Sequence, residues 1–211
     1  MLAERGVEGY SLREVARRAG VSPAAPAHHF GDAGGLLAAV ATLAYDELTA
    51  ALEAGNVRGG DDPVARLREQ GIGYVGFALR YPGRFNLMFR TSLERTDALQ
   101  HSANAAFEAL HDGVRDLYGV ARGAELALAQ QHALLAIWSV VHGFAHLAAA
   151  GQFNHVAPAG GREALLREIL APVLQQQLEG LRGPVARPAR ARLSAKASAS
   201  SRRSARPTRT R

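Results

Sequence analysis

Apolar residues recur at intervals of three and four along most of the chain, and this spacing constrains the fold more than any other feature. After Asp32, for example, Leu36, Val40 and Leu43 fall on one stripe. Such intervals place side chains on one face of an α-helix, whereas a half-buried strand alternates strictly. The sequence has neither that alternation nor a hairpin signal. The expected helices span about 11–19, 23–30, 33 to at least 48, 63–80, 85–89, 96–118, 123–150 and 161–181. The sequence therefore predicts an all-α fold.

Start and stop signals are densest near the N-terminus. Ser11 and Glu14 fit a capping box, in which the serine oxygen accepts a backbone N–H and the glutamate reaches back to the serine N–H. The helix that they begin is expected to end at Gly20. Ser22 then serves as an N-cap with Pro23 at the first helical position. Two short helices separated by a tight turn are therefore expected.

The residues between these caps suit a helix-turn-helix that reads double-stranded DNA. Ala16 is small where the two helices must cross, and Gly20 permits the turn. Val15, Ala19 and Val21 are expected to supply a small core under the crossing. The second helix begins with small side chains, which let its N-terminal part enter a major groove.

Candidate DNA contacts occur in both helices. They are Ser11, Arg13, Arg17, Ser22, Pro23, Ala24, Ala25, His28 and His29. His28 is expected to contact phosphate or a base, and His29 to pack against a helix. Arg13 and Arg17 either touch the DNA backbone, which is the sequence-independent part of affinity, or lie on a solvated face. A shared metal between the two histidines is disfavoured, because adjacent helical side chains point about 100° apart.

Two segments resemble a known family. The string SLREVARRAGVS at 11–22, followed by His29-Phe30 and Leu36-Leu37, resembles the TetR family of bacterial repressors. The string IWSVVHG at 137–143 is similar to the Trp–His–Gly signature of one class of TetR C-terminal domain, and the YPGRF segment at 81–85 suits that class.

The resemblance implies the organisation of the whole chain. It implies an N-terminal three-helix DNA-binding domain over residues 1–48 and a helical ligand-sensing and dimerisation domain over 49–182. A basic tail, expected to be disordered, follows over 183–211. The implied function is a ligand-responsive transcription regulator, a repressor released from a palindromic operator by a small apolar effector.

Departures from the family pattern keep an alternative open. Only the end of the usual first helix, residues 2–6, is expected to be present. Ala27 stands where the family usually has a tyrosine that contacts phosphate, and the stretch after Gly31 lacks a common lysine. The alternative is a dimeric small-molecule-binding protein that has lost operator recognition.

The candidate effector site is a set of aromatic and apolar side chains with one histidine, a composition typical of small-molecule pockets. The candidates are Phe77, Tyr81, Phe85, Met88, Phe89, Phe107, Trp138 and His142. No arginine lies among them, so a neutral, largely apolar effector is expected. Trp138, His142 and His146 share one helical stripe, which is a ligand-pocket wall, a dimer-facing wall or plain core. The histidine pair lacks the glutamate of a His-Glu-x-x-His metalloprotease, so no metal is expected.

The last two expected helices have wide apolar faces. The resemblance implies that these helices form a four-helix homodimer bundle with a second subunit. We expect Leu166 and Leu174 to lie in that seam, so that replacing both by glutamate yields monomers.

Charge and composition bound the remaining classes. The whole chain carries a formal charge of +6, but residues 183–211 contain eight arginines, Lys196 and no acidic residue, so the rest of the chain is net negative. Nonspecific adhesion of this tail to nucleic acid or membrane surfaces is a further alternative. There is no cysteine, no uninterrupted apolar run of 18 residues, no phosphate-binding glycine loop and no nucleophile motif. A cytoplasmic, non-enzymatic protein without cofactor or membrane partner is expected.

Overall fold

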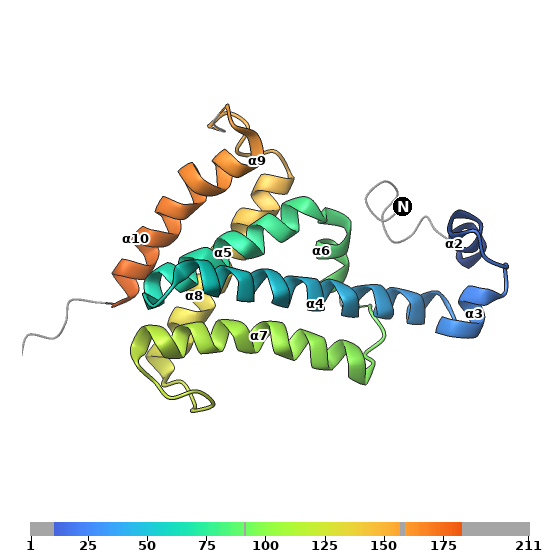
Figure 1. Ribbon diagram of the computed structural model, residues 1–211, viewed down its shortest axis with the longest axis horizontal. Coiled ribbons are helices and arrows are strands. Elements are labelled where there is room, and N and C mark those ends of the chain that lie inside the picture. Colours follow the sequence, from blue (N-terminus) through green and yellow to red (C-terminus); the bar gives the residue numbers. More distant parts are fainter. Residues whose placement is uncertain (1–10, 91, 157–158, 183–211) are drawn as a thin grey trace, which may run out of the picture.

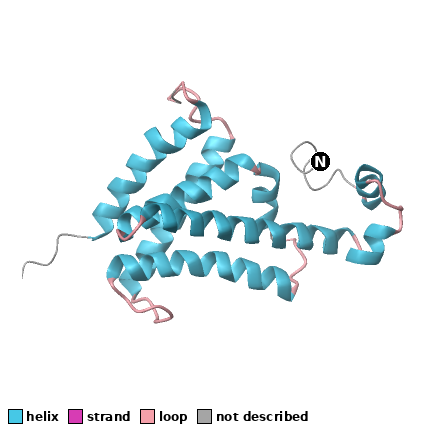
Figure 2. Cartoon of the chain, in the orientation of Figure 1, coloured by secondary structure: helices cyan, strands magenta, loops and turns pink. Residues whose placement is uncertain are grey.

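The computed structural model describes residues 11–90, 92–156 and 159–182. Every regular element in these residues is a helix, and none of them forms a strand (Figure 2). The elements are α2 (Leu12–Ala19), α3 (Ala25–Phe30), α4 (Ala33–Gly59), α5 (Pro63–Arg80), α6 (Pro82–Met88), α7 (Asp97–Tyr118), α8 (Leu128–Ala149), α9 (Gly161–Ala164), the π-helix η1 (Leu165–Leu170) and α10 (Ala171–Arg182). The all-α prediction is confirmed.

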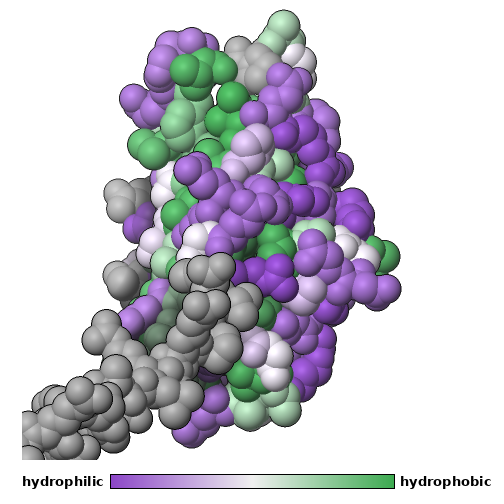
Figure 3. Space-filling model, turned by 90° about the vertical axis from the view of Figure 1, so that its left-hand side faces the viewer, coloured by the Kyte–Doolittle hydropathy of each residue, from purple (hydrophilic) through white to green (hydrophobic). Residues whose placement is uncertain are grey.

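The long helix α4 organises the molecule. Its N-terminal end carries α2 and α3, which stand apart from the other helices (Figure 1). It packs against α5 and α7, and α5 in turn packs against α8 and α10. Seen from the end that bears α10, hydrophilic residues cover most of the surface and apolar ones form smaller groups between them (Figure 3).

Side-chain caps fix where the central helices begin. One carboxylate oxygen of Asp32 accepts the backbone N–H of Gly35 at 2.9 Å, which starts α4. Asp62 accepts the N–H groups of Val64 and Ala65 at 3.1 and 3.3 Å, and Pro63 follows it at the first helical position. These caps satisfy donors that a helix start otherwise leaves unpaired. Both expected starts are confirmed.

The start of the second short helix differs from the prediction. It begins at Ala25, with Ala24 as N-cap and no side-chain cap, instead of at Pro23. Pro26 has no N–H to donate to the Ser22 carbonyl, and the N–H of Ala25 bonds that carbonyl at 3.1 Å instead. The chain therefore makes a turn before it becomes α-helical.

Two later helices also differ from their predicted bounds. The helix expected over 123–150 begins only at Leu128, because Gly123 adopts a positive φ of 76° and the chain turns there. The short piece expected over 85–89 spans Pro82–Met88. The C-terminal helix expected over 161–181 contains the π-helical segment η1.

The main core lies between α4, α5, α8 and α10. Leu48, Val75, Val141, Leu170 and Leu174 are among its buried members. Burial of Leu166 and Leu174 inside a single chain, at 5% and 1% exposure, contradicts their expected place in a dimer seam. Their stripe faces α5. A helix with apolar residues on most of its faces can bury only one of those faces within its own subunit.

The expected domain limits meet the fold in different ways. Residue 48, the proposed end of the DNA-binding domain, falls inside α4, which continues unbroken to Gly59. The remnant of the first helix at 2–6 and the tail at 183–211 lie outside the described residues. The division into domains stays a prediction.

Two described helices, α4 and α8, are long and apolar enough to cross a membrane by length and composition alone. Core helices of soluble proteins pass the same test. Leu48 of α4 and Val141 of α8 are both buried in the core described above.

Candidate functional site

The helix-turn-helix predicted from the sequence is present as α2, a turn and α3. The Ser11 hydroxyl accepts the N–H of Glu14 at 3.3 Å, and Gly20 ends α2 with a φ of 69°. Ala16 is fully buried at the crossing, and Pro26 of α3 is also buried. The close crossing needs a side chain as small as that of Ala16.

The helix pair exposes the residues predicted to contact DNA. Ser11, Arg13, Arg17, Ser22, Pro23, Ala24, His28 and His29 are exposed, and Ala25 is half-buried. They lie at the far end of α4 from the rest of the molecule (Figure 1). Their contact with DNA stays a prediction. The surface that these residues form is accessible to DNA.

Electrostatics on α2 centre on Glu14. Its carboxylate accepts hydrogen bonds from Arg17 at 2.9 and 2.7 Å and from Arg18 at 2.8 Å. These hydrogen bonds, led by the one from Arg17, lower the pKa of Glu14 to about 2. Part of the positive charge of α2 is therefore paired within the helix, and Arg17 is held in place while its side chain remains 71% exposed.

Packing under the helix pair is thinner than expected. Val21 is 48% exposed and Phe30 is 40% exposed, and His29 is exposed instead of packed against a helix. The ring of His29 contacts only its neighbours His28 and Phe30, at centroid distances of 5.4 and 6.3 Å, among the described aromatic pairs. The reason is geometric, since α3 has only six residues and its buried position is occupied by Pro26.

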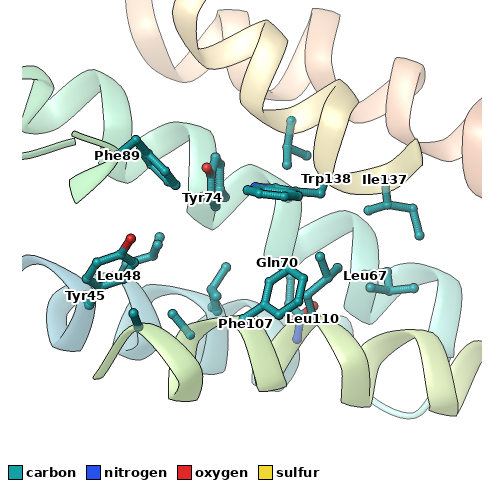
Figure 4. Close-up of a pocket in the computed structure, with 15 residues that line it drawn as sticks. Tyr45, Leu48, Leu67, Gln70, Tyr74, Phe89, Phe107, Leu110, Ile137 and Trp138 are labelled. Carbon is teal, nitrogen blue, oxygen red and sulfur yellow. The ribbon is translucent and has the colours of Figure 1, made fainter. Parts of the chain in front are cut away.

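An apolar cavity of about 330 Å³ lies in the helical body. Its walls come from α4, α5, α7 and α8 and from Phe89 after α6 (Figure 4). The lining residues are Tyr45, Leu48, Leu52, Leu67, Gln70, Gly71, Tyr74, Phe89, Ala103, Ala106, Phe107, Leu110, Ile137, Trp138 and Val141. The volume falls within the range of small-molecule sites.

The structure separates the predicted pocket residues into two groups. Phe89, Phe107 and Trp138 line the cavity, with the rings of Phe107 and Trp138 at 5.6 Å in an edge-to-face arrangement. The others do not line it. Phe77, Phe85 and Met88 are buried core residues, Tyr81 is partly buried against that core, and His142 lies behind the cavity wall. These corrections follow from which face of α5 and α6 turns inward, which an aromatic pattern alone does not reveal.

Sequence reasoning missed the contributions of α4 and of the polar residues on α5. Tyr45, Leu48 and Leu52 follow one another at intervals of three and four and line one wall. This spacing was visible in the sequence and could have indicated the wall. Gln70 and Tyr74, also four residues apart, carried no comparable signal because either could have been solvent-exposed.

His142 acts through Tyr74. The Tyr74 hydroxyl and Nδ1 of His142 are 2.8 Å apart, and Nε2 of His142 is 3.2 Å from Nε2 of His146. Burial and the nearby His146 lower the pKa of His142, so the neutral ring is favoured. Burial raises the pKa of Tyr74 well above its ordinary range, and a hydrogen bond with Trp138 opposes this only in part. His142 therefore connects Tyr74 in the cavity wall to the exposed residue His146.

Gln70 is the other buried polar group of the cavity. Its side-chain amide donates to the carbonyl of Ala109 at 3.3 Å and is only 3% exposed. This hydrogen bond fixes the orientation of the amide in the cavity wall, which Figure 4 shows together with Phe107 and Leu110. A bound molecule would meet the amide of Gln70, the phenols of Tyr45 and Tyr74 and the indole of Trp138 in otherwise apolar walls.

The described residues bring no third metal ligand to the pair His142 and His146. In the described part of the chain, no group of three or more His, Cys, Asp or Glu side chains is placed to hold a metal ion. The arrangement of the pair instead serves the hydrogen-bond chain from Tyr74.

Comparisons with known proteins agree with this geometry. The family profile of bacterial regulatory proteins of the tetR family matches residues 1–40, and the profile of the tetracyclin repressor-like C-terminal domain matches residues 67–173. None of the curated proteins matches the chain in sequence.

Solved structures of similar chains cover nearly the whole length. A protein with unknown function from Rhodococcus sp. RHA1 is 30% identical, with a TM-score of 0.70 over 86% of this chain and 89% of that one. Protein SCO4313 is 22% identical, with a TM-score of 0.63 over 87% and 90%. The TetR family transcriptional regulator PfmR from Thermus thermophilus is 20% identical, with a TM-score of 0.56 over 88% and 91%.

The likeness to the last two structures shows the fold, and the two profiles assign both halves of the chain. The helix-turn-helix at one end of α4 and the helical body at the other match these two parts in order. The chain belongs to the TetR family of bacterial regulatory proteins.

Proposed function

We propose that this TetR family regulator is a ligand-responsive repressor that leaves a palindromic operator when a small, largely apolar effector enters its cavity. One observation carries the proposal. Tyr45, Leu48 and Leu52 of α4 line the cavity, and the same unbroken helix begins beside α3. An effector that shifts α4 therefore acts on the element that holds the DNA-reading surface.

DNA recognition is assigned to the turn before α3 and its first residues. Ser22, Pro23 and Ala24 are exposed and small, so the backbone can approach base edges closely. Exposed Arg13 and Arg17 are assigned to phosphate, where they fix register without reading sequence. No enzymatic activity is proposed for the chain, and the site of action is the cytoplasm, where the DNA is.

A homodimer is required for a palindromic site, because a two-fold protein matches a two-fold operator. Exposed apolar side chains on α8 and α10 support an interface there. Leu135 is 50% exposed and Val173 is 42% exposed, whereas Leu166 and Leu174 are buried within the subunit. We assign the interface to the exposed residues.

Light scattering tests the interface. The double variant Leu135→Glu, Val173→Glu is expected to be a folded monomer, because two charges would be buried against their copies. The matched control is Leu43→Glu, which changes a leucine 62% exposed on α4 and should remain a dimer. A double variant that stays dimeric would place the interface elsewhere.

Binding to the DNA that flanks the gene of the protein tests the function itself. The wild type should prefer one palindromic fragment over random DNA by at least about 1,000-fold. Ala24→Glu, which puts a carboxylate at the exposed start of α3, should abolish this preference, whereas Ala54→Glu on the exposed side of α4 should not. Equal affinity for all DNA would refute operator recognition.

One alternative retains a specific observation in its favour. Ala27 is exposed on α3, where the family usually has a tyrosine that contacts phosphate. A ligand-binding protein that has lost operator recognition would bind small molecules and show no DNA preference. The same experiment therefore separates the two functions.

A further inference from the structure

A second chamber of about 270 Å³ lies beside the apolar cavity. Its lining residues come from α4, the end of α6, the connection between α6 and α7, and the first turns of α7. Its character is different, because the polar side chains Arg90, Arg95 and Gln100 contribute to its lining. Met88, Leu93 and Leu99 lie on its apolar side.

The two chambers adjoin. Tyr45 and Ala103 line both of them. The Tyr45 hydroxyl donates to the carbonyl of Met88 at 3.0 Å, and its ring meets that of Phe89 edge to face at 6.4 Å. The ring of Tyr45 and the small side chain of Ala103 therefore border both the apolar space and the basic one.

The charged side chains in the described lining of the second chamber are basic. Among the residues that the structure describes, its lining includes two arginines and neither Asp nor Glu. Glu94, in the same connection, lies toward the start of α4, since its carboxylate is 3.7 Å from the position of a Cβ on Gly34. A paired apolar and cationic space suits a molecule with a hydrocarbon body and an anionic end.

We propose that the effector is an amphipathic anion whose apolar body fills the first cavity and whose carboxylate or phosphate end lies beside Arg95 in the second chamber. This inference rests on the proposed function and specifies the chemical class of its ligand. It departs from the neutral effector expected from the sequence, because that expectation considered only the aromatic residues of the first cavity. Arg90 and Arg95 lie in the connection that leads from Phe89 into α7, outside that set.

Fluorescence of Trp138, the only tryptophan in the chain, tests the inference directly. Trp138 lines the first cavity and reports the apolar body, whichever end group the probe carries. The probes are decanoate, decyl phosphate and uncharged 1-decanol, titrated into the full-length protein. We expect both anions to bind at least about 10-fold more tightly than decanol, since a charge-assisted hydrogen bond adds about that much.

Variants locate the charge. Arg95→Gln should reduce the preference for anions to less than about 3-fold, and Arg95→Lys should retain most of it. The matched control is Arg162→Gln, an exposed arginine of α9 that removes the same charge far from both chambers in sequence and should change nothing. Because Arg95 and Arg162 are both exposed, none of these variants should affect folding.

The outcomes separate this inference from the proposed function. If decanol binds as tightly as the anions, or if Arg95→Gln keeps the full preference, the second chamber does not hold the head group. Release of operator DNA by decanol alone would then leave the regulator intact and overturn the anionic ligand. If none of the three probes changes Trp138 emission, the two-chamber site is refuted, and the DNA titration without probe still decides the regulatory function.

Discussion

The Tyr74 hydroxyl and Nδ1 of His142 lie 2.8 Å apart and join α5 to α8 behind the cavity wall. Tyr74 lines the cavity and His142 does not, so the histidine shapes the site only through its neighbours. Phe89, which also lines the cavity, has its ring 4.6 Å from that of His142. The protonation state of His142 therefore affects the surroundings of Tyr74 and Phe89, the two cavity residues that His142 contacts.

Stability should fall on mild acidification because of His142. Its folded-state pKa lies below the ordinary value of about 6.5, so the unfolded chain takes up this proton first as the pH falls. The contribution of neutral His142 to the free energy of unfolding is fully present at pH values above the ordinary pKa. It is lost progressively as the pH falls below that value toward the folded-state pKa. Thermal unfolding between pH 7.5 and 5.5 should show a decline that His142→Gln reduces.

His132→Gln is the control for this effect, since His132 is an exposed residue of the same helix. It should leave the decline unchanged. An equal reduction in both variants, or none in His142→Gln, would mean that another group controls the acid sensitivity.

Glu69 should be the most costly carboxylate to neutralise. Its side chain is 9% exposed and accepts hydrogen bonds from Arg167 at 2.9 and 2.8 Å and from Arg58 at 3.3 Å. Burial raises the pKa of Glu69, but the arginines outweigh it and the net pKa is lowered. Glu69→Gln should reduce the free energy of unfolding by about 1–3 kcal/mol, measured by urea denaturation.

The exposed Glu168 of η1 provides the comparison. Glu168→Gln should change stability by less than about 0.5 kcal/mol at the same protein concentration, as surface substitutions usually do. Similar losses in the two variants would show that the arginine cluster does not stabilise the α5–η1 contact.

Adjacent residues of α10 should behave in opposite ways. Leu174 is 1% exposed and packs against α5, where its Cδ1 atom would lie only 2.6 Å from a Cβ on Gly71. Leu174→Ala should cost about 2–5 kcal/mol of stability without changing the oligomeric state. Val173→Ala should cost far less in the subunit, because Val173 is 42% exposed. Monomers from Leu174→Ala at full stability would reverse these assignments.

Removal of residues 183–211 should flatten the salt dependence of DNA binding. This segment, which lies outside the described residues, carries nine positive side chains and no acidic one. Each phosphate contact contributes a slope of about −0.9 in log affinity against log salt. The truncated protein should bind all DNA more weakly yet keep its preference for operator over random DNA. An unchanged slope would show that the tail stays off the DNA.

Much of the fold was predictable because it depends on local chemistry. Asp32, Asp62 and Ser11 cap helices as their neighbours in sequence indicated, and the periodic apolar stripes gave the helical class. The start of α3 was mispredicted because two signals competed. Ser22-Pro23 favours a helix start, but Pro26 removes the N–H that would have closed its first turn.

The candidate site was less predictable, because lining a cavity depends on which neighbour each face meets. Phe85 and Phe89 both carry aromatic rings four residues apart, yet Phe85 is buried core and Phe89 lines the space. Leu174 and Val173 differ in the same way between core and surface. Periodicity identifies a buried face, but it does not say whether a cavity, a core or a second subunit covers that face.

The unbroken length of α4 has a mechanical consequence. Twenty-seven residues make a rod about 40 Å long, with the cavity near its C-terminal half and the helix-turn-helix at its N-terminal end. For a stiff rod, a tilt of about 5° about a pivot at Leu52 moves Ala33, nineteen residues away, by about 2–3 Å. In a dimer, the displacements of the two α4 N-termini would add or cancel along the DNA. Their sum is to be compared with the groove repeat of about 34 Å. A small ligand could thus change the distance between the two helix-turn-helix units of a dimer, so that this distance no longer matches the repeat of the major groove.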